Sequence, residues 1–179
     1  MLRDTRRAIH ANVKTSRFDF QVFDCERIPY PDNSFDLVIA NHILFYCKNL
    51  TSVFEEISRV LKTGGTFVCS TYGAAHMKEI NELVSEFDDR IVLSADRLFE
   101  RFGKENGADL LAPYFQNIKW LSYEDSLHVT EPETLISYVL SCHGNQNQYI
   151  IDHYKEFRSF VKKKTEKGLH ITKDAVSYT

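Results

Sequence analysis

The sequence predicts an α/β fold whose central unit is two parallel strands joined by a helix. Apolar patterns typical of strands and of helices alternate along the chain, as they do in sheets whose strands are connected by helices. Residues 35–40 (FDLVIA) are an almost continuous apolar run, the pattern of a strand that is covered on both faces. Residues 66–71 (TFVCST) fit a second buried strand. A crossover of this kind is right-handed in nearly all proteins.

The connecting helix is predicted over residues 49–62. Its apolar side chains recur every three or four positions and form one stripe: Leu50, Val53, Phe54, Ile57, Val60 and Leu61. Gly64 and Gly65 come next, and a glycine just past a helix favours the left-handed backbone that ends it. We therefore expect the helix to stop at this glycine pair.

The segments upstream of this unit carry weaker signals. Residues 2–11 fit a short polar helix without an upstream capping residue, and residues 18–23 fit a strand. Residues 29–33 (PYPDN) are rich in turn-forming residue types. We expect this strand to reach the central unit through that turn.

Helices predominate after Gly73. They are predicted over residues 75–87, after a Ser94 cap, and over 108–115, 133–142 and 148–164. Thr130 and Glu133 have the spacing of a capping box at the start of one of these helices. Two more strands are predicted, over residues 117–129 and 168–178.

Composition and charge exclude several classes of protein. The 179 residues carry a formal net charge of −3 with both signs interspersed, so we expect no nucleic-acid interface. No apolar stretch approaches the ~18 residues of a membrane span, and no signal peptide is evident. The four cysteines have no metal-site spacing, so we expect no metal: Cys25, Cys47, Cys69 and Cys142. These features predict a cytoplasmic protein with reduced thiols.

A dense series of short motifs covers residues 18–73. It includes FDCERIPYPDNSFDLVIANHILFYCKNL and then FEEISRVLKTGGTFVCSTYG. In order these are an acidic residue before a small one, Ile-Pro-Tyr, an Asp, Ser-Phe-Asp, a strand, and Arg-Val-Leu-Lys before Gly-Gly. The series resembles the class I S-adenosylmethionine-dependent methyltransferases of the ubiquinone/menaquinone-biosynthesis group (methyltransferase type 11). Thr63 stands where that family usually has Pro, and the resemblance continues more weakly to about residue 142.

The resemblance implies a Rossmann-like sheet with helices on both faces and the strand order 3-2-1-4-5-7-6. Residues 1–179 would be one domain. Residues 1–73 would form part of the cofactor-binding core, without the family's first two strands. Residues 74–179 would supply the C-terminal antiparallel strands, with a helical insertion that covers the acceptor side.

The resemblance also implies a cofactor site for S-adenosylmethionine. Asp24 would accept a hydrogen bond from the adenine amino group, and the backbone N–H of Cys25 would donate to a ring nitrogen. Asn41 would lie behind the methionine portion and contribute through its backbone. Without the resemblance, an ordinary carboxylate at a strand end or in a turn is the favoured interpretation of Asp24.

The acceptor of the methyl group would lie beside the same strand ends. His42 would face the methyl-transfer region as a base or a substrate contact, since its reference pKa is near neutral. The alternative for His42 is packing without chemistry. Phe45 and Tyr46 are candidates for the same pocket, although an aromatic residue in this segment more often belongs to the core. Tyr72 and His76 are weaker candidates still.

One part of the family pattern is missing from the sequence. The family's glycine-rich turn lets backbone amides approach the cofactor closely, but none of the seven glycines of this chain makes a Gly-X-Gly. The opening Met1-Leu2 resembles an internal site of the family, so we expect an N-terminally truncated domain. Cofactor binding by this chain should then be weak or absent, and methyl transfer by it alone negligible.

The missing strands would also leave a buried sheet edge exposed. We expect either the strand at residues 18–23 to move inward or two copies to pair as a homo-oligomer. Two functions follow: a methyltransferase for a small molecule, or a non-catalytic, oligomeric binding protein of the same fold. A nicotinamide-dependent dehydrogenase is disfavoured because no phosphate-binding turn is present.

Overall fold

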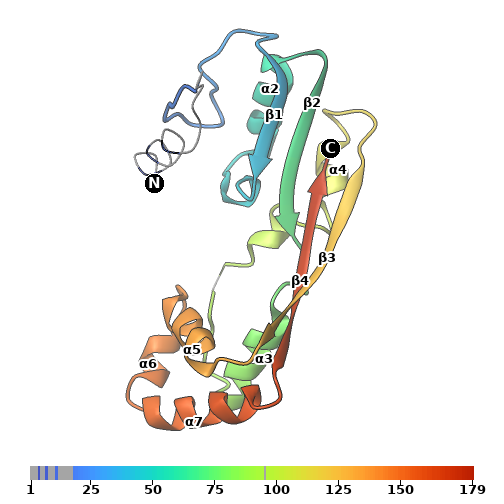
Figure 1. Cartoon of the computed structure of the whole chain (residues 1–179). Coiled ribbons are helices and arrows are strands. Elements are labelled where there is room, and N and C mark those ends of the chain that lie inside the picture. Colours follow the sequence, from blue (N-terminus) through green and yellow to red (C-terminus); the bar gives the residue numbers. More distant parts are fainter. Residues whose placement is uncertain (1–3, 5–6, 8–10, 12–17, 95) are drawn as a thin grey trace.

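The fold is centred on a four-stranded mixed sheet. The structure is a computed structural model that describes residues 4, 7, 11, 18–94 and 96–179. Its strands are β1 (Phe35–Asn41), β2 (Leu61–Tyr72), β3 (Trp120–Val129) and β4 (Leu169–Tyr178). They lie in the order β1-β2-β4-β3 (Figure 1). β1 and β2 are parallel, whereas β4 runs antiparallel to both of its neighbours.

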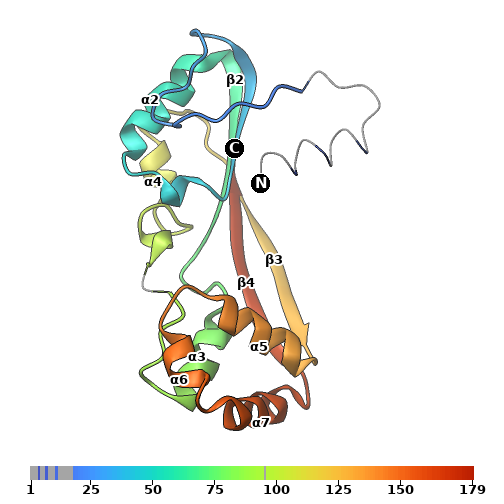
Figure 2. The same cartoon turned by 90° about the vertical axis from the view of Figure 1, so that its left-hand side faces the viewer.

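Short helices make up most of the rest of the chain. The α-helices are α2 (Leu50–Val60), α3 (Lys78–Phe87), α4 (Gly107–Leu111), α5 (Pro132–Ser141), α6 (Gln146–Ile150) and α7 (Tyr154–Thr165). Two single 3-10 turns are η1 (Leu44–Tyr46) and η2 (Leu98–Glu100). In Figure 2, α2 and α4 lie on one face of the sheet near β1 and β2, and the other four helices gather at the opposite end of the long β3–β4 pair. The predicted βαβ unit and the predicted antiparallel C-terminal strands are both confirmed.

The helix α2 forms where its sequence predicts. Asn49 caps it, because the Asn49 side chain accepts a hydrogen bond from the N–H of Ser52 at 3.3 Å. The predicted apolar stripe is buried and packs against the sheet: Val53, Phe54, Ile57 and Val60. Burial of this face against the sheet therefore stabilises the helix that connects the two parallel strands.

The helix α2 ends at Val60, earlier than the glycine pair that was predicted to stop it. Leu61 has extended backbone and already pairs with Phe35 of β1. The register then shifts, and Gly64 with its φ of 77° lies in the irregular stretch before the regular pairing resumes. Pairing with β1 thus ends the helix, and Gly64 provides the left-handed backbone conformation of a bulge inside β2.

The strand predicted over residues 18–23 is wrong. Residues 18–24 have no regular structure, so this segment does not move into the sheet. Among the described residues, nothing pairs with the outer edge of β1. On the face of β1 opposite α2, Leu37 and Ile39 are 49% and 63% exposed. The helix predicted over 2–11 lies largely outside the described residues.

Three further predictions fail at helix ends. Ser94 does not cap a helix. The element that follows is the short 3-10 turn η2, and its N-cap residue is Arg97. The capping box is also wrong, since α5 begins at Pro132 and its N-cap is Glu131, whose side chain makes no capping hydrogen bond. The helix predicted over 148–164 is two helices, α6 and α7, separated by three residues.

Two clusters of buried side chains stabilise the chain. The first lies between α2 and the sheet and includes Phe54, Phe102 and Tyr178. The second fills the helical end and includes Ile136, Phe157 and Ile171. Within the described ranges, no helix has the length and apolar character needed to cross a membrane.

Phe54 is expected to be the most sensitive position of the first cluster. Its ring is 1% exposed and meets the rings of Phe102, Tyr114 and Phe115 at centroid distances of 6.1, 5.4 and 6.1 Å. Phe54→Ala should lower the free energy of unfolding by about 3–5 kcal/mol through lost contacts and a cavity. Urea denaturation measures this, with the exposed neighbour Glu55→Ala as the control. Equal stability of the two variants would contradict the packing described.

Candidate functional site

The carboxyl ends of β1 and β2 meet at one edge of the sheet. Because the strands are parallel, Asn41 at the end of β1 pairs with Ser70, two residues before the end of β2. The Asn41 carboxamide oxygen accepts a short hydrogen bond from the Ser70 hydroxyl. This contact fixes the point at which the chain leaves β1. Sequence reasoning found Asn41 but missed Ser70, which only the strand register identifies.

His42 turns the chain sharply away from the sheet. Its φ of 49° is left-handed, which costs a non-glycine residue on the order of 1 kcal/mol. The His42 N–H offsets this by donating to the carbonyl and the hydroxyl of Ser70, at 3.2 and 3.1 Å. The imidazole lies edge-on to Phe45, with ring centroids 6.3 Å apart. Among the described residues, the ring nitrogens of His42 have no hydrogen-bond partner.

The predicted substrate-side residues form one contiguous aromatic group next to His42. Phe45 is buried and belongs to the core, as the alternative interpretation allowed, whereas Tyr46 is 64% exposed. The ring of Phe45 lies 4.7 Å from that of Tyr46 and 5.2 Å from that of Tyr72. Tyr72 in turn lies 5.2 Å from the ring of His76. Two segments that are far apart in sequence, 45–46 and 72–76, thus lie side by side.

The two titratable rings at the end of β2 are both held neutral. Burial lowers the pKa of His76, and its electrostatic interactions with Lys173 and His42 lower it further, against an opposing effect of Asp174. The Nδ1 atom of His76 accepts the backbone N–H of Asp174 at 3.2 Å. The neutral ring therefore carries its proton on Nε2. Burial likewise raises the pKa of Tyr72.

The turn that contains Asp24 lies against the chain just beyond β1. Asp24 Oδ1 accepts the N–H of Glu26 at 3.0 Å, which forms a tight Asx turn. Glu26 Oε1 accepts the N–H of Asn49 at 3.0 Å. The sulfur of Cys25 lies 3.3 Å from that of Cys47. The turn is thereby bound to the segment that follows the aromatic group.

This turn presents two hydrogen-bonding groups that no described residue uses. They are the second carboxylate oxygen of Asp24, which is exposed, and the backbone N–H of Cys25. One accepts and one donates, so the pair complements the amino group and adjacent ring nitrogen of an adenine edge. The residues present fit that part of a nucleoside ligand. Nowhere in the described ranges do three or more His, Cys, Asp or Glu side chains gather as a metal site would need.

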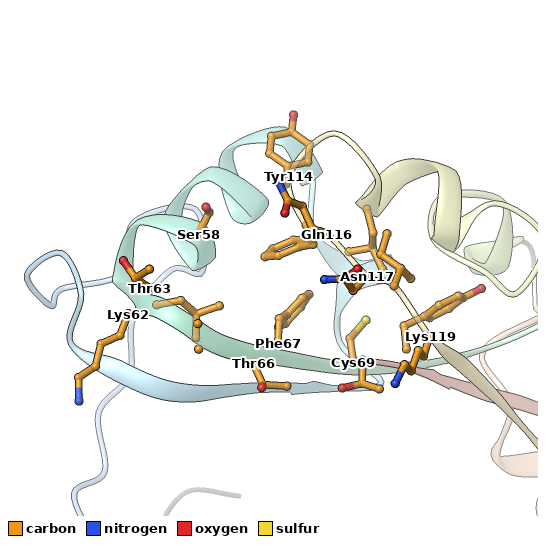
Figure 3. A pocket seen from close by; sticks show the side chains of 18 of the residues that line it. Ser58, Lys62, Thr63, Thr66, Phe67, Cys69, Tyr114, Gln116, Asn117 and Lys119 are labelled. Carbon is orange, nitrogen blue, oxygen red and sulfur yellow. The ribbon is translucent and has the colours of Figure 1, made fainter.

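A large cavity lies at the other end of β2. It measures about 650 Å³ and is lined by both polar and apolar side chains. Figure 3 shows Phe67 and Cys69 rising from β2 into it, with Gln116 and Asn117 from the segment opposite. No titratable residue of the predicted site lines it, and no sequence motif predicted it. The chemistry described above therefore lies outside this cavity.

The amino-acid sequence is similar to known methyltransferases. Residues 1–69 match the family described as "Methyltransferase domain". A malonyl-[acyl-carrier protein] O-methyltransferase of Nitrosospira multiformis is 37% identical over 78 residues, which are 44% of this chain and 25% of that protein. A ubiquinone/menaquinone biosynthesis C-methyltransferase of Desulfotalea psychrophila is 41% identical over 51 residues, 28% of this chain and 21% of that protein. The chain spans about a quarter of the length of these curated relatives.

The fold is shared with solved structures. One is a candidate methyltransferase from Bacillus halodurans C-125, with a TM-score of 0.62 and 17% identity. The superposition covers 99% of this chain and 76% of that chain. At this identity the similarity shows the fold alone, and the fold is the Rossmann-like sheet that the sequence predicted.

The lowered pKa of His76 should make stability fall in mild acid. A histidine whose folded-state pKa lies below its unfolded value of 6.5 favours folding above that pH, and this contribution declines as the pH falls below it. His76→Asn keeps an acceptor for the Asp174 N–H but does not titrate. As the pH falls from 7.5 to 5.5, the free energy of unfolding measured with urea should therefore decrease more for the wild type than for His76→Asn.

The exposed His143 supplies the matched control. His143→Asn should retain the wild-type dependence on pH. The carboxyl of Glu56, whose pKa is lowered from 4.5 to about 2 chiefly by its hydrogen bond with Arg59, titrates below this window. Identical pH profiles for the wild type and His76→Asn would show that His76 is not the group responsible.

Proposed function

We propose, for a chain that belongs to the class I S-adenosylmethionine-dependent methyltransferases, that it supplies the adenine-side turn and the acceptor side of a methyl-transfer site. The observation that carries this proposal is that three predicted parts of the site lie close together. The Asp24 turn, the Asn41–His42 corner and the Tyr72–His76 pair lie around the same carboxyl ends of β1 and β2. Ligands of open α/β sheets bind at such ends.

The chain's own groups would hold the nucleoside end of the cofactor. S-adenosylmethionine supplies, when bound, a methyl group on a positively charged sulfur. Asp24 would accept from the adenine amino group and the Cys25 N–H would donate to the ring. Asn41 would support the methionine portion from behind, held in place by Ser70.

The acceptor would lie against the aromatic group. Among the described residues nothing hydrogen-bonds to the imidazole of His42, so its nitrogens are available to take a proton from the acceptor. His76 cannot do so at Nδ1, which already accepts a hydrogen bond. Its Nε2–H would instead donate to the acceptor and orient it. Tyr46 and Tyr72 would supply the walls of the acceptor site.

A small molecule is the acceptor that this aromatic lining favours. The two relatives carry the methyl group to different atoms, one to oxygen and one to carbon, by their names. The atom methylated by this chain is therefore left to experiment. The helical end, formed by α3 and α5–α7, would help to choose the acceptor.

Cofactor binding by this chain alone should be weak. Its seven glycines form no Gly-X-Gly, the kind of turn that brings backbone amides close to the ligand. Losing even ~4 kcal/mol of contacts weakens binding roughly a thousandfold. Methyl transfer by the chain alone should be correspondingly slow.

A non-catalytic, oligomeric binding protein is the second candidate function. The face of the sheet opposite α2 favours it, because four large apolar side chains of the described residues are strongly exposed there: Leu37, Ile39, Leu121 and Tyr123. In Figure 2, no described helix covers this face beside β1. The unpaired edge of β1 would accept a strand of a second copy.

Titration with S-adenosylhomocysteine tests the first proposal. Amide chemical shifts should move at residues 24–27 and 41–46 only at high ligand concentration, with no calorimetric heat below roughly 0.1 mM. Asp24→Ala should abolish the shifts, and the exposed Asp89→Ala should leave them unchanged. Tight binding by the wild type would refute the argument from the glycine turn. Shifts elsewhere would place the ligand in a different site.

Light scattering across a range of protein concentrations tests the second proposal. The wild type should dimerise, and Ile39→Lys should shift the chain to monomer by placing an unpaired charge in the contact. Thr51→Lys adds the same charge on exposed α2 and should leave the dimer intact. A wild type that stays monomeric at all concentrations would exclude pairing of copies through this face.

A further inference from the structure

We propose that Cys25 and Cys47 form a redox modification site, which a disulfide oxidant of the oxidised-glutathione class converts into an intramolecular disulfide. The two residues are 22 positions apart in sequence, and their sulfur atoms lie 3.3 Å apart. This site goes beyond methyl transfer and does not rest on it, because its readout is the sulfur–sulfur bond itself.

The distance between the thiols is short enough for closure by side-chain rotation. A disulfide bond measures about 2.05 Å, so the two sulfurs need to approach by only about 1.3 Å. Cys25 belongs to the Asx turn at Asp24, and Cys47 directly follows the turn η1. Neither residue lies inside a helix or strand, so rotation does not disturb a hydrogen-bonded ladder.

Backbone contacts on both sides hold the two segments together independently of the thiols. Glu26, next to the first cysteine, accepts the N–H of Asn49 at 3.0 Å. Glu56 of α2 accepts the N–H of Ile28 at 2.8 Å. The start and the middle of α2 thus anchor the turn. The proximity of the two sulfurs follows from this framework rather than from two flexible side chains.

The order of attack follows from exposure. Cys25 is half-buried and Cys47 buried. The Cys25 sulfur attacks oxidised glutathione, which forms a mixed disulfide and releases one glutathione thiolate. The Cys47 thiol then loses its proton and displaces the second glutathione. Two thiols have lost two electrons and two protons, and one glutathione disulfide has become two glutathione thiols.

Burial explains why Cys47 reacts second. Burial raises the pKa of the Cys47 thiol to about 12, and its hydrogen bond to Cys25 and the nearby charges add to the effect. A thiol of this kind is a poor first nucleophile. Once Cys25 is held in a mixed disulfide, the attack of Cys47 is intramolecular, so even a small fraction of Cys47 thiolate closes the bond.

The other two cysteines provide matched controls within the same chain. Cys69 is 1% exposed in the core, and burial raises its pKa to about 12. Cys142 donates to the carbonyl of Tyr138 at 3.5 Å. Within the described ranges, neither has another thiol beside it. Oxidation should therefore select one pair among four thiols.

Peptide mapping of the full chain tests the proposal directly. Trypsin cleaves after Arg17, Arg27 and Lys48, so the two cysteines fall on separate peptides, 18–27 and 28–48. The reduced chain is incubated with oxidised glutathione, alkylated and digested. The expected result is a cross-linked pair of these two peptides and the loss of two of the four free thiols. Oxidation should also raise the melting temperature by on the order of 5–10 °C.

Four single variants make the test selective. Cys25→Ser and Cys47→Ser should each abolish the cross-link and the gain in melting temperature, whereas Cys69→Ser and Cys142→Ser should keep both. Circular dichroism monitors folding, and the half-buried Cys25→Ser decides the outcome where Cys47→Ser unfolds. The proposal is overturned by four thiols that stay free, by a stable mixed disulfide without closure, or by a bridge through Cys69, Cys142 or a second chain.

Discussion

The candidate site depends on the parallel pairing of β1 with β2. In a parallel pair both strands end at the same edge of the sheet, so the residues that follow the two strands lie close together. The register places Asn41 opposite Ser70, and Ser70 then holds both the Asn41 side chain and the His42 backbone. A register slip by one residue would turn these side chains to the other face. The corner at His42 keeps its left-handed backbone only because two acceptors of Ser70 satisfy its N–H.

The helix α2 holds the Asp24 turn in place through hydrogen bonds to the segment that follows the turn. Arg59 donates to both oxygens of Glu56 and to the carbonyls of Ile28 and Tyr30, so it ties the segment after the turn to the helix. Glu56 in turn accepts the N–H of Ile28. The pKa of Glu56 is lowered to about 2 chiefly by its hydrogen bond with Arg59, so the carboxylate stays ionised at every physiological pH. A chain segment without regular structure thereby obtains a defined position.

The sequence was informative where local pattern and tertiary packing agree. The stripe on α2 and the apolar runs of β1 and β2 each describe a surface that the fold buries, so their positions could be predicted. The strand expected over residues 18–23 failed because a strand needs a neighbour, and a pattern of alternating residues does not supply one. The prediction that Gly64 ends the helix failed for a related reason, because the pairing of Leu61 with Phe35 ends the helix before Gly64.

The candidate site divides in the same way. Asp24, His42 and Tyr72 could be named in advance because each follows or ends a predicted strand or belongs to a motif. Ser70 and the Nδ1 contact of His76 to Asp174 could not, because they arise between segments that only the folded sheet brings together. The thiol pair was equally hidden, since Cys25 and Cys47 carry no sequence spacing that indicates contact. The sequence allowed candidate side chains to be named one at a time, but not the contacts between them.

The Asp24 turn links the two proposals by thermodynamics. The Cys25 backbone N–H would contact an adenine ring, and the Cys25 sulfur would join Cys47. If the disulfide moves that N–H out of position and weakens the nucleoside contact, bound nucleoside must disfavour the disulfide by the same factor, because coupling free energies are reciprocal. If the disulfide instead fixes the turn in the conformation seen here, binding and oxidation must favour one another. The sign of that coupling reports whether the turn described here is already the form that would receive the ligand.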